Sequence, residues 1–211
     1  ANPVLCIFGG RTSPTNPLDD LLFCEYDYSS YAISQRPTDV RGELPSPRWG
    51  HSLSALSGRN HKIAVLVGGR DQNSALDSIH VLSICLTEHP HVLWERICVE
   101  PFTEARFHHT AVSLSDQVFV FGGLSDVNDT LKPFSTNSDN DPVSFLFHAN
   151  NAHADTAFQV LGYIPSNLFG QSAALLSVAN DKRGLVVCGG VAPASQPASL
   201  QLFELQSSPE G

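Results

Sequence analysis

The 211-residue sequence contains no methionine, so it has no initiator residue at its first position. It also has no apolar run that approaches the length of a membrane span. Its first ten residues, ANPVLCIFGG, lack the basic segment of a secretory signal peptide, and their apolar run is too short for one. We therefore expect a cytoplasmic piece of a longer protein that does not bind a membrane.

Basic residues are scarce in this chain. It has 12 lysines and arginines against 21 aspartates and glutamates, which gives a formal net charge of −9. Because phosphate contacts need clustered lysine or arginine side chains, this balance disfavours a generally basic nucleic-acid binder and leaves room only for a local basic patch. Apolar residues make up 42% of the chain, which suits a globular core.

Sequence signatures of chemistry are also missing. There is no Gly-x-Ser-x-Gly elbow and no Gly-x-Gly-x-x-Gly loop. His89 and His91 would share one face of a strand, but no third ligand lies near them in the sequence. We predict no catalytic residue, no metal site and no cofactor site within this chain. The cysteines include no C-x-x-C pair, and we interpret them as small core residues in a reducing compartment: Cys6, Cys24, Cys85, Cys98 and Cys188.

What the sequence does contain is a repeat. Four short apolar runs each end in a pair of glycines, and the pairs recur about 60 residues apart. Glycine permits a positive φ and a close approach of backbones, so we predict that each pair marks a sharp exit from a crowded strand. The pairs are Gly9 and Gly10, Gly68 and Gly69, Gly122 and Gly123, and Gly189 and Gly190.

A second motif precedes three of these pairs. It reads PRWGHSLSAL at 47–56, ARFHHTAVSL at 105–114 and NLFGQSAALL at 167–176, and it alternates small or polar with apolar residues as a strand does. Together with the glycine-ended run it predicts a β-hairpin. A third strand follows each glycine pair, and a fourth follows in three units, at 31–36, 94–99 and 157–163. Four short strands per unit predict an all-β propeller.

These motifs resemble the kelch family of β-propellers. The Pro-Arg-x-Gly-His pattern is complete at residues 47–51 and decays in the later units. The resemblance implies an all-β, kelch-type β-propeller segment over residues 1–211, divided into units of roughly 1–40, 41–100, 101–163 and 164–211. About three and a half blades are present, so we expect the chain to be part of a larger propeller.

A narrower resemblance rests on the loop Gly9, Gly10, Arg11 and Pro14, followed by the strands that open at residues 48–51 and 106–109. This order resembles the C-terminal kelch region of the leucine carboxyl methyltransferase 2 family, which acts in wybutosine biosynthesis. The resemblance implies a methyltransferase domain in the same polypeptide, S-adenosylmethionine as the cofactor of that domain, and phenylalanine tRNA as a substrate that the propeller helps to position. Whether the complete polypeptide is an enzyme depends on that domain.

Two other function classes stay open. One is a kelch protein–protein interaction module, such as a ubiquitin-ligase substrate adaptor, and the other is a stand-alone structural propeller. Salt dependence separates the tRNA interpretation from the first of these, because phosphate contacts make affinity fall steeply with salt.

Four arginines mark a candidate partner face that would take tRNA or another macromolecule. Arg11 and Arg70 directly follow glycine pairs, and Arg48 and Arg106 open the first strands of their units. Alternating strand direction predicts that all four lie on one face near the central channel, where guanidinium groups suit a phosphate or a carboxylate. Alternatively, Arg48 and Arg106 bond to backbone carbonyls between blades, and Arg11 and Arg70 are merely solvated.

An acidic insert, residues 125–142, is predicted to lie on the same face. It carries Asp126, Asp129, Asp139 and Asp141. Such an insert would repel RNA or would dock on a basic surface of another domain; a disordered, solvated loop is the alternative.

Overall fold

The computed structural model describes residues 3–57, 62–85, 91–98, 105–114, 117–127, 130–133, 144–148, 153–155, 160–161, 169–177, 183–191 and 201–205. Their regular secondary structure is all β-strand, and no helix among them is long and apolar enough to cross a membrane.

The first two units each form one sheet. The first sheet has the order β1-β4-β5, and the second has the order β6-β10-β9-β8-β7. The first sheet contains β1 (Val4–Phe8), β4 (Leu21–Asp27) and β5 (Ala32–Gln35). The second contains β6 (Asp39–Gly42), β7 (Ser52–Ser57), β8 (Lys62–Val67), β9 (Ile79–Cys85) and β10 (His91–Ile97).

The last two units form four-stranded sheets in the orders β11-β12-β15-β16 and β17-β20-β19-β18. The third sheet contains β11 (Thr110–Leu114), β12 (Gln117–Phe121), β15 (Ser144–His148) and β16 (His153–Asp155). The fourth contains β17 (Val160–Leu161), β18 (Phe169–Ser177), β19 (Arg183–Val191) and β20 (Gln201–Leu205). The predicted opening hairpins are confirmed by antiparallel pairing of β7 with β8, β11 with β12, and β18 with β19.

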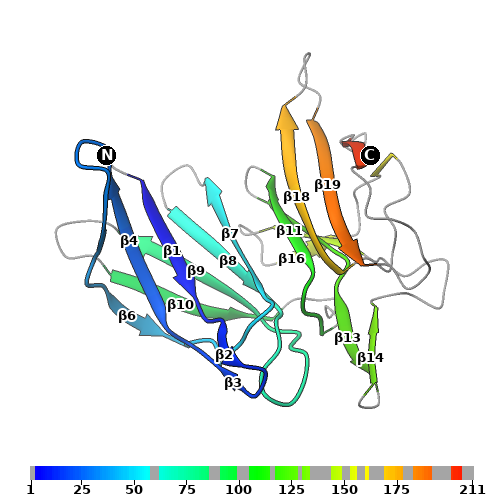
Figure 1. Cartoon of the computed structure of the whole chain (residues 1–211), viewed down its shortest axis with the longest axis horizontal. Coiled ribbons are helices and arrows are strands. Elements are labelled where there is room, and N and C mark those ends of the chain that lie inside the picture. Colours follow the sequence, from blue (N-terminus) through cyan, green and yellow to red (C-terminus); the bar gives the residue numbers. More distant parts are fainter. Residues whose placement is uncertain are drawn as a thin grey trace.

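The sheets succeed one another in chain order, with β1 and β4 on one side of the molecule and β18 and β19 on the other (Figure 1). Two small ribbons follow glycine pairs: β2 (Arg11–Ser13) with β3 (Asn16–Pro17), and β13 (Leu124–Val127) with β14 (Thr130–Pro133). Both ribbons lie along the lower edge of Figure 1. The loops that follow the first and third glycine pairs therefore open onto this face of the molecule.

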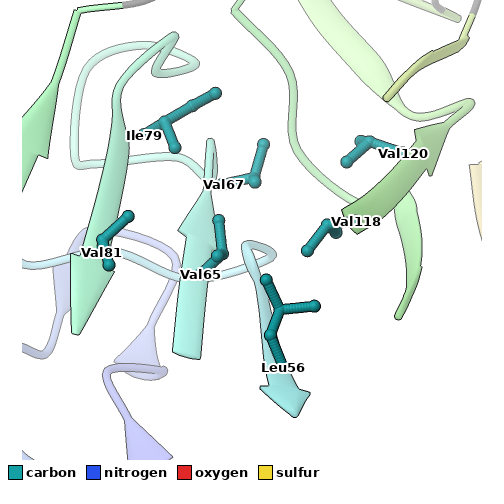
Figure 2. Close-up of a cluster of buried hydrophobic side chains, with 7 residues drawn as sticks. All are labelled: Leu56, Val65, Val67, Ile79, Val81, Val118 and Val120. Carbon is teal, nitrogen blue, oxygen red and sulfur yellow. The ribbon is translucent and has the colours of Figure 1, made fainter. Parts of the chain in front are cut away.

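The glycine-ended strand of the second sheet, β8, is buried on both of its faces. On β8, Val65 and Val67 pack with Val118 and Val120 of the third sheet, as Figure 2 shows. The alternate residues Ala64 and Leu66 of the same strand pack instead in the cluster shared with the first sheet, whose members include Phe8, Phe23 and Trp94. Such two-sided burial explains why this strand reads as a continuous apolar run.

The same rule holds one sheet further on. Phe119 and Phe121 of β12 point away from the second sheet and pack with Leu185 and Val187 of β19. Each inter-sheet layer is thus built from alternate residues of neighbouring second strands, because successive side chains of a strand point to opposite faces. This stacking is the propeller-like arrangement that the repeat predicts.

Segments that link two units pair with the outer edge of the following sheet. We expected residues 157–163 to supply the fourth strand of the third unit, but β16 occupies that place through its pairing with β15, and β17 pairs with β20 of the fourth sheet. In the same way β6 runs parallel to β10 at the outer edge of the second sheet.

The cysteines differ from our interpretation of them as core residues. All five are free, but Cys98 and Cys188 are exposed, and the other three are only half-buried. A strand presents every second side chain to one face, so a position within a strand-like run does not by itself imply burial.

All eight paired glycines have a positive φ, between 57° and 106°. At some of these positions a side chain would also collide with a neighbouring backbone. A Cβ at Gly68 would lie 2.4 Å from the carbonyl oxygen of Arg106, and one at Gly9 would lie 2.6 Å from that of Arg48. Gly9 and Gly68 are therefore the points where the next sheet approaches the backbone.

Gly68→Ala should destabilise the protein far more than Gly170→Ala. The two glycines share nearly the same φ, +57° and +67°, so the left-handed backbone costs about 1–2 kcal/mol at both. Only the Cβ at position 68 also meets a carbonyl, whereas the one at 170 meets nothing within 4 Å. Urea denaturation should show at least about 2 kcal/mol more loss for the former, the range typical of overpacking. Equal losses would mean that φ alone selects glycine here.

Candidate functional site

The site is built on a backbone clasp that joins the first sheet to the second and the second sheet to the third. Gly10 N–H donates to the carbonyl of Arg48 over 2.9 Å, and Gly69 N–H donates to the carbonyl of Arg106 over 2.8 Å. Each of these arginines also donates its own N–H back to the preceding sheet, to Leu18 or Leu76. The clasp fixes the start of one sheet's first strand against the glycine-pair loop of the preceding sheet.

The buried side chain of Arg48 adds further hydrogen bonds to the clasp. It is 2% exposed, and its Nη1 donates to the carbonyl of Gly68 over 3.0 Å and to Ser78 Oγ over 2.8 Å. Its other donors bond to Ser46. Burial lowers the pKa of Arg48 to about 10, with nearby Asp71 opposing the shift, so the guanidinium stays charged at neutral pH. Its donors are used within the chain.

Arg106 repeats this arrangement. It is also 2% exposed, and its Nη1 lies 3.4 Å from the carbonyl of Gly122, the counterpart of Gly68. We expected Arg48 and Arg106 to face a partner together with Arg11 and Arg70. The structure instead buries both side chains, because the carbonyl of the first glycine in each pair takes their hydrogen bonds. The alternative interpretation, that they bond to backbone carbonyls, describes what is observed.

The arginines that follow glycine pairs do reach the surface layer, each over an aromatic ring of the next sheet. The guanidinium carbon of Arg11 lies 3.9 Å from the ring centroid of Trp49, and that of Arg70 lies 5.3 Å from the centroid of Phe107. A guanidinium over an aromatic face gains a cation–π attraction that does not use its N–H donors. Arg11 and Arg70 are therefore equivalent positions on neighbouring sheets.

The two positions differ in their charge partners. Arg70 forms an ion pair with Asp126 of the β13–β14 ribbon, and the same carboxylate accepts a hydrogen bond from Ala75 N–H. Arg11 is exposed, and among the described residues no carboxylate forms an ion pair with it. Of the four predicted arginines, Arg11 is thus the one that is exposed. Within the described part of the chain, its guanidinium has no carboxylate partner.

The beginning of the acidic insert is ordered. Residues 124–127 and 130–133 pair as a β-ribbon, and Asp126 ties this ribbon to the second sheet through Arg70. This differs from the alternative of a solvated loop. The predicted positions Asp129, Asp139 and Asp141 lie outside the described residues.

A line of backbone hydrogen bonds crosses from sheet to sheet beside these aromatics. His108 N–H donates to the carbonyl of Gly50 over 2.8 Å, and Gly170 N–H donates to the carbonyl of His108 over 2.9 Å. The three residues occupy the same repeat position, directly after Trp49, Phe107 and Phe169. His108 is half-buried, and its ring contacts Trp49 with 5.3 Å between centroids. His108 was not among the predicted site residues.

A serine–histidine contact occurs deeper in the fold. Ser52 Oγ lies 2.8 Å from His109 Nε2. Burial lowers the pKa of His109 to about 3 and that of His51 to about 4, with Arg106 and Arg48 respectively adding to the effect. The other ring nitrogen of His109 has no carboxylate partner, and a histidine this buried and this weakly basic is a poor general base. We assign this pair to packing between the second and third sheets.

Metal ligation finds no support in the described residues. They hold no group of three or more histidine, cysteine, aspartate or glutamate side chains placed to bind an ion. His89 lies outside the described ranges.

Comparison with known proteins identifies the repeat. The family model of the KLHDC2/KLHL20/DRC7 Kelch-repeats domain matches residues 1–208. A solved structure, "Structure of YjhT", superposes with a TM-score of 0.54 at 14% identity, and the match covers 89% of this chain and 49% of that one. At that identity the likeness shows the fold alone, a partial propeller.

Three curated proteins match parts of the chain. V(D)J recombination-activating protein 2 of Gallus gallus is 25% identical over 145 residues, 60% of this chain and 26% of that protein. The same protein of Danio rerio is 27% identical over 140 residues, 56% and 24% of the two chains. tRNA wybutosine-synthesizing protein 2/3/4 of Oryza sativa subsp. japonica is 36% identical over 83 residues, 39% and 7% of the two chains. The chain spans about a quarter or less of each.

Arg48→Ala should lower the free energy of unfolding by about 3 kcal/mol, because it removes donors from buried carbonyls and leaves a hole between two sheets. Arg41→Ala is the matched control. Arg41 is exposed on β6, and within the described part of the chain its ion pair is with Asp39 at the surface, where such pairs contribute about 0–1 kcal/mol. Chemical denaturation of both variants checks this, and a loss below about 1 kcal/mol for Arg48→Ala would contradict the structural role.

Stability should fall as pH drops from about 6.5 toward 4. In that range the unfolded state protonates its histidines while His51 and His109 stay neutral in the folded state, so the unfolded state binds more protons and is favoured. His109→Gln, which copies Gln171 of the fourth sheet, should reduce this loss by about 1.4 kcal/mol per pH unit. Thermal melts at pH 7, 6 and 5 measure it; an unchanged slope would mean that His109 titrates normally.

Proposed function

Since this chain belongs to the KLHDC2/KLHL20/DRC7 family of kelch-repeat domains, we propose that it is a macromolecular binding platform. More specifically, it is the kelch portion of an S-adenosylmethionine-dependent tRNA methyltransferase of wybutosine biosynthesis. It holds phenylalanine tRNA beside a methyltransferase domain of the same cytoplasmic polypeptide. The 36% identity over 83 residues to the tRNA wybutosine-synthesizing protein of Oryza sativa supports this assignment.

The observation that carries the proposal is the exposed Arg11 stacked on Trp49. A guanidinium already held over an indole loses little conformational freedom when it binds, and its fork of donors matches a phosphate. The Trp49 ring beneath it packs in turn against Phe107 of the third sheet, which supports its position. A guanidinium held in place over an aromatic ring is suited to bind one phosphate of a nucleic-acid backbone.

The charge balance limits how this platform binds RNA. Arg48 and Arg106 are buried, and Asp126 neutralises Arg70, so the described face offers one open guanidinium rather than a basic patch. Platform contacts therefore position tRNA more than they attract it. Most of the phosphate attraction falls to the methyltransferase domain of the complete polypeptide.

Arg11→Ala in the complete natural polypeptide should weaken binding of phenylalanine tRNA about tenfold and reduce the slope of log affinity against log salt by about 1, because one phosphate contact is lost. Arg41→Ala is the matched control, since it removes another exposed arginine far from the aromatic layer. Fluorescence anisotropy at several salt concentrations provides the measurement. If both variants bound tRNA with the same affinity and the same dependence on salt, this face would not be the tRNA-binding surface.

A protein partner is the second candidate, as in a ubiquitin-ligase substrate adaptor. It is favoured by the contact between Arg70 and Asp126, in which a protein carboxylate already binds one of the two equivalent arginines. In that case the complete polypeptide would show no salt-dependent affinity for tRNA, and Arg11→Ala would reduce capture of a protein partner instead.

A further inference from the structure

His108 occupies a position where the neighbouring sheets have glycine. The φ angles of Gly50, His108 and Gly170 are 65°, 54° and 67°. A left-handed backbone costs a residue with a Cβ about 1–2 kcal/mol, and bulky residues rarely adopt it. The backbone hydrogen bonds of this line run through N–H and C=O groups, which glycine would supply equally well. The imidazole therefore needs an explanation that backbone geometry does not give.

The surroundings of the imidazole suggest one. Its ring centroid lies 5.2 Å from that of Phe107 and 5.3 Å from that of Trp49, and Trp49 is the ring on which Arg11 stacks. Partial burial, with a smaller effect of the charge on Arg11, lowers the pKa of His108. At neutral pH the imidazole is thus uncharged, with one nitrogen that donates a hydrogen bond and one that accepts.

We propose that Arg11, Trp49 and His108 form a subsite for one ribonucleotide step of an RNA. Arg11 binds the phosphate, and His108 exchanges hydrogen bonds with the adjacent ribose 2′-hydroxyl. A hydroxyl that both donates and accepts is the match for a neutral imidazole, and it is the group that distinguishes RNA from DNA. The inference rests on the proposed tRNA function and assigns to this face the recognition of ribose.

The equivalent place on the next sheet lacks both features. There Arg70 stacks on Phe107, but Asp126 holds its guanidinium, and the residue at the position of His108 is Gly170. Within the described chain, Trp49 is therefore the one ring that has both an arginine without a carboxylate partner, Arg11, and a histidine, His108, beside it. The proposed subsite is therefore a single one in the described chain. A single subsite agrees with a face that positions one nucleotide of an RNA.

The test compares an RNA hairpin carrying the anticodon loop of phenylalanine tRNA with a DNA hairpin of the same sequence. Both are titrated by anisotropy against the complete natural polypeptide. The wild type should bind RNA about tenfold more tightly than DNA. His108→Gly should reduce this ratio to below about threefold while leaving the melting temperature unchanged or higher, because the backbone strain is removed. Arg11→Ala should weaken RNA and DNA alike.

The possible outcomes are distinguishable. An RNA-to-DNA ratio that His108→Gly leaves intact overturns the subsite but not the tRNA platform. A His108→Gly variant that melts markedly lower shows a structural imidazole and also overturns the subsite. A wild type that binds neither hairpin overturns the proposed function itself. His108→Asn, which tolerates the left-handed backbone and retains a donor and an acceptor, should restore part of the preference for RNA.

Discussion

The hydrogen-bonded clasp between a glycine pair and the arginine that opens the next sheet is the contact on which the rest of the structure depends. It works in both directions. The glycine N–H binds the arginine carbonyl, and the arginine side chain binds the carbonyl of the following glycine pair. Because a charged group is buried in the clasp, its full set of partners must be present together. The clasp holds neighbouring sheets in the relative position in which their apolar side chains pack against each other.

Much of this architecture could be predicted from the sequence. The four glycine-ended runs predicted the second strands, and the alternation after each aromatic residue predicted the hairpins. Positive φ at the glycine pairs followed from the properties of glycine. These features are local and repeated, so each copy corroborates the others, and tertiary context does not override them.

The candidate site was less predictable, for particular reasons. Arg11 and Arg48 are both arginines beside turns, and only the inter-sheet contacts reveal that one is open and the other buried. Asp126 meets Arg70 across a sheet boundary, which no pattern within one unit encodes. His108 could have been found by aligning it with Gly50 and Gly170, since a histidine at a glycine position of a repeat signals a special backbone. The segment at 157–163 misled because a short strand does not specify which sheet it joins.

The parallel strand β6 gives the second sheet a further property. It leaves the first unit, runs beside β10 at the outer rim, and then leads back to Arg48 at the inner clasp. Val40 of β6 also packs against the cluster that holds Phe8 and Phe23 of the first sheet. The segment that connects the first two sheets is thus a strand of the second sheet with a side chain packed on the first. Separating these sheets would therefore cost this apolar contact as well as the hydrogen bonds of the clasp.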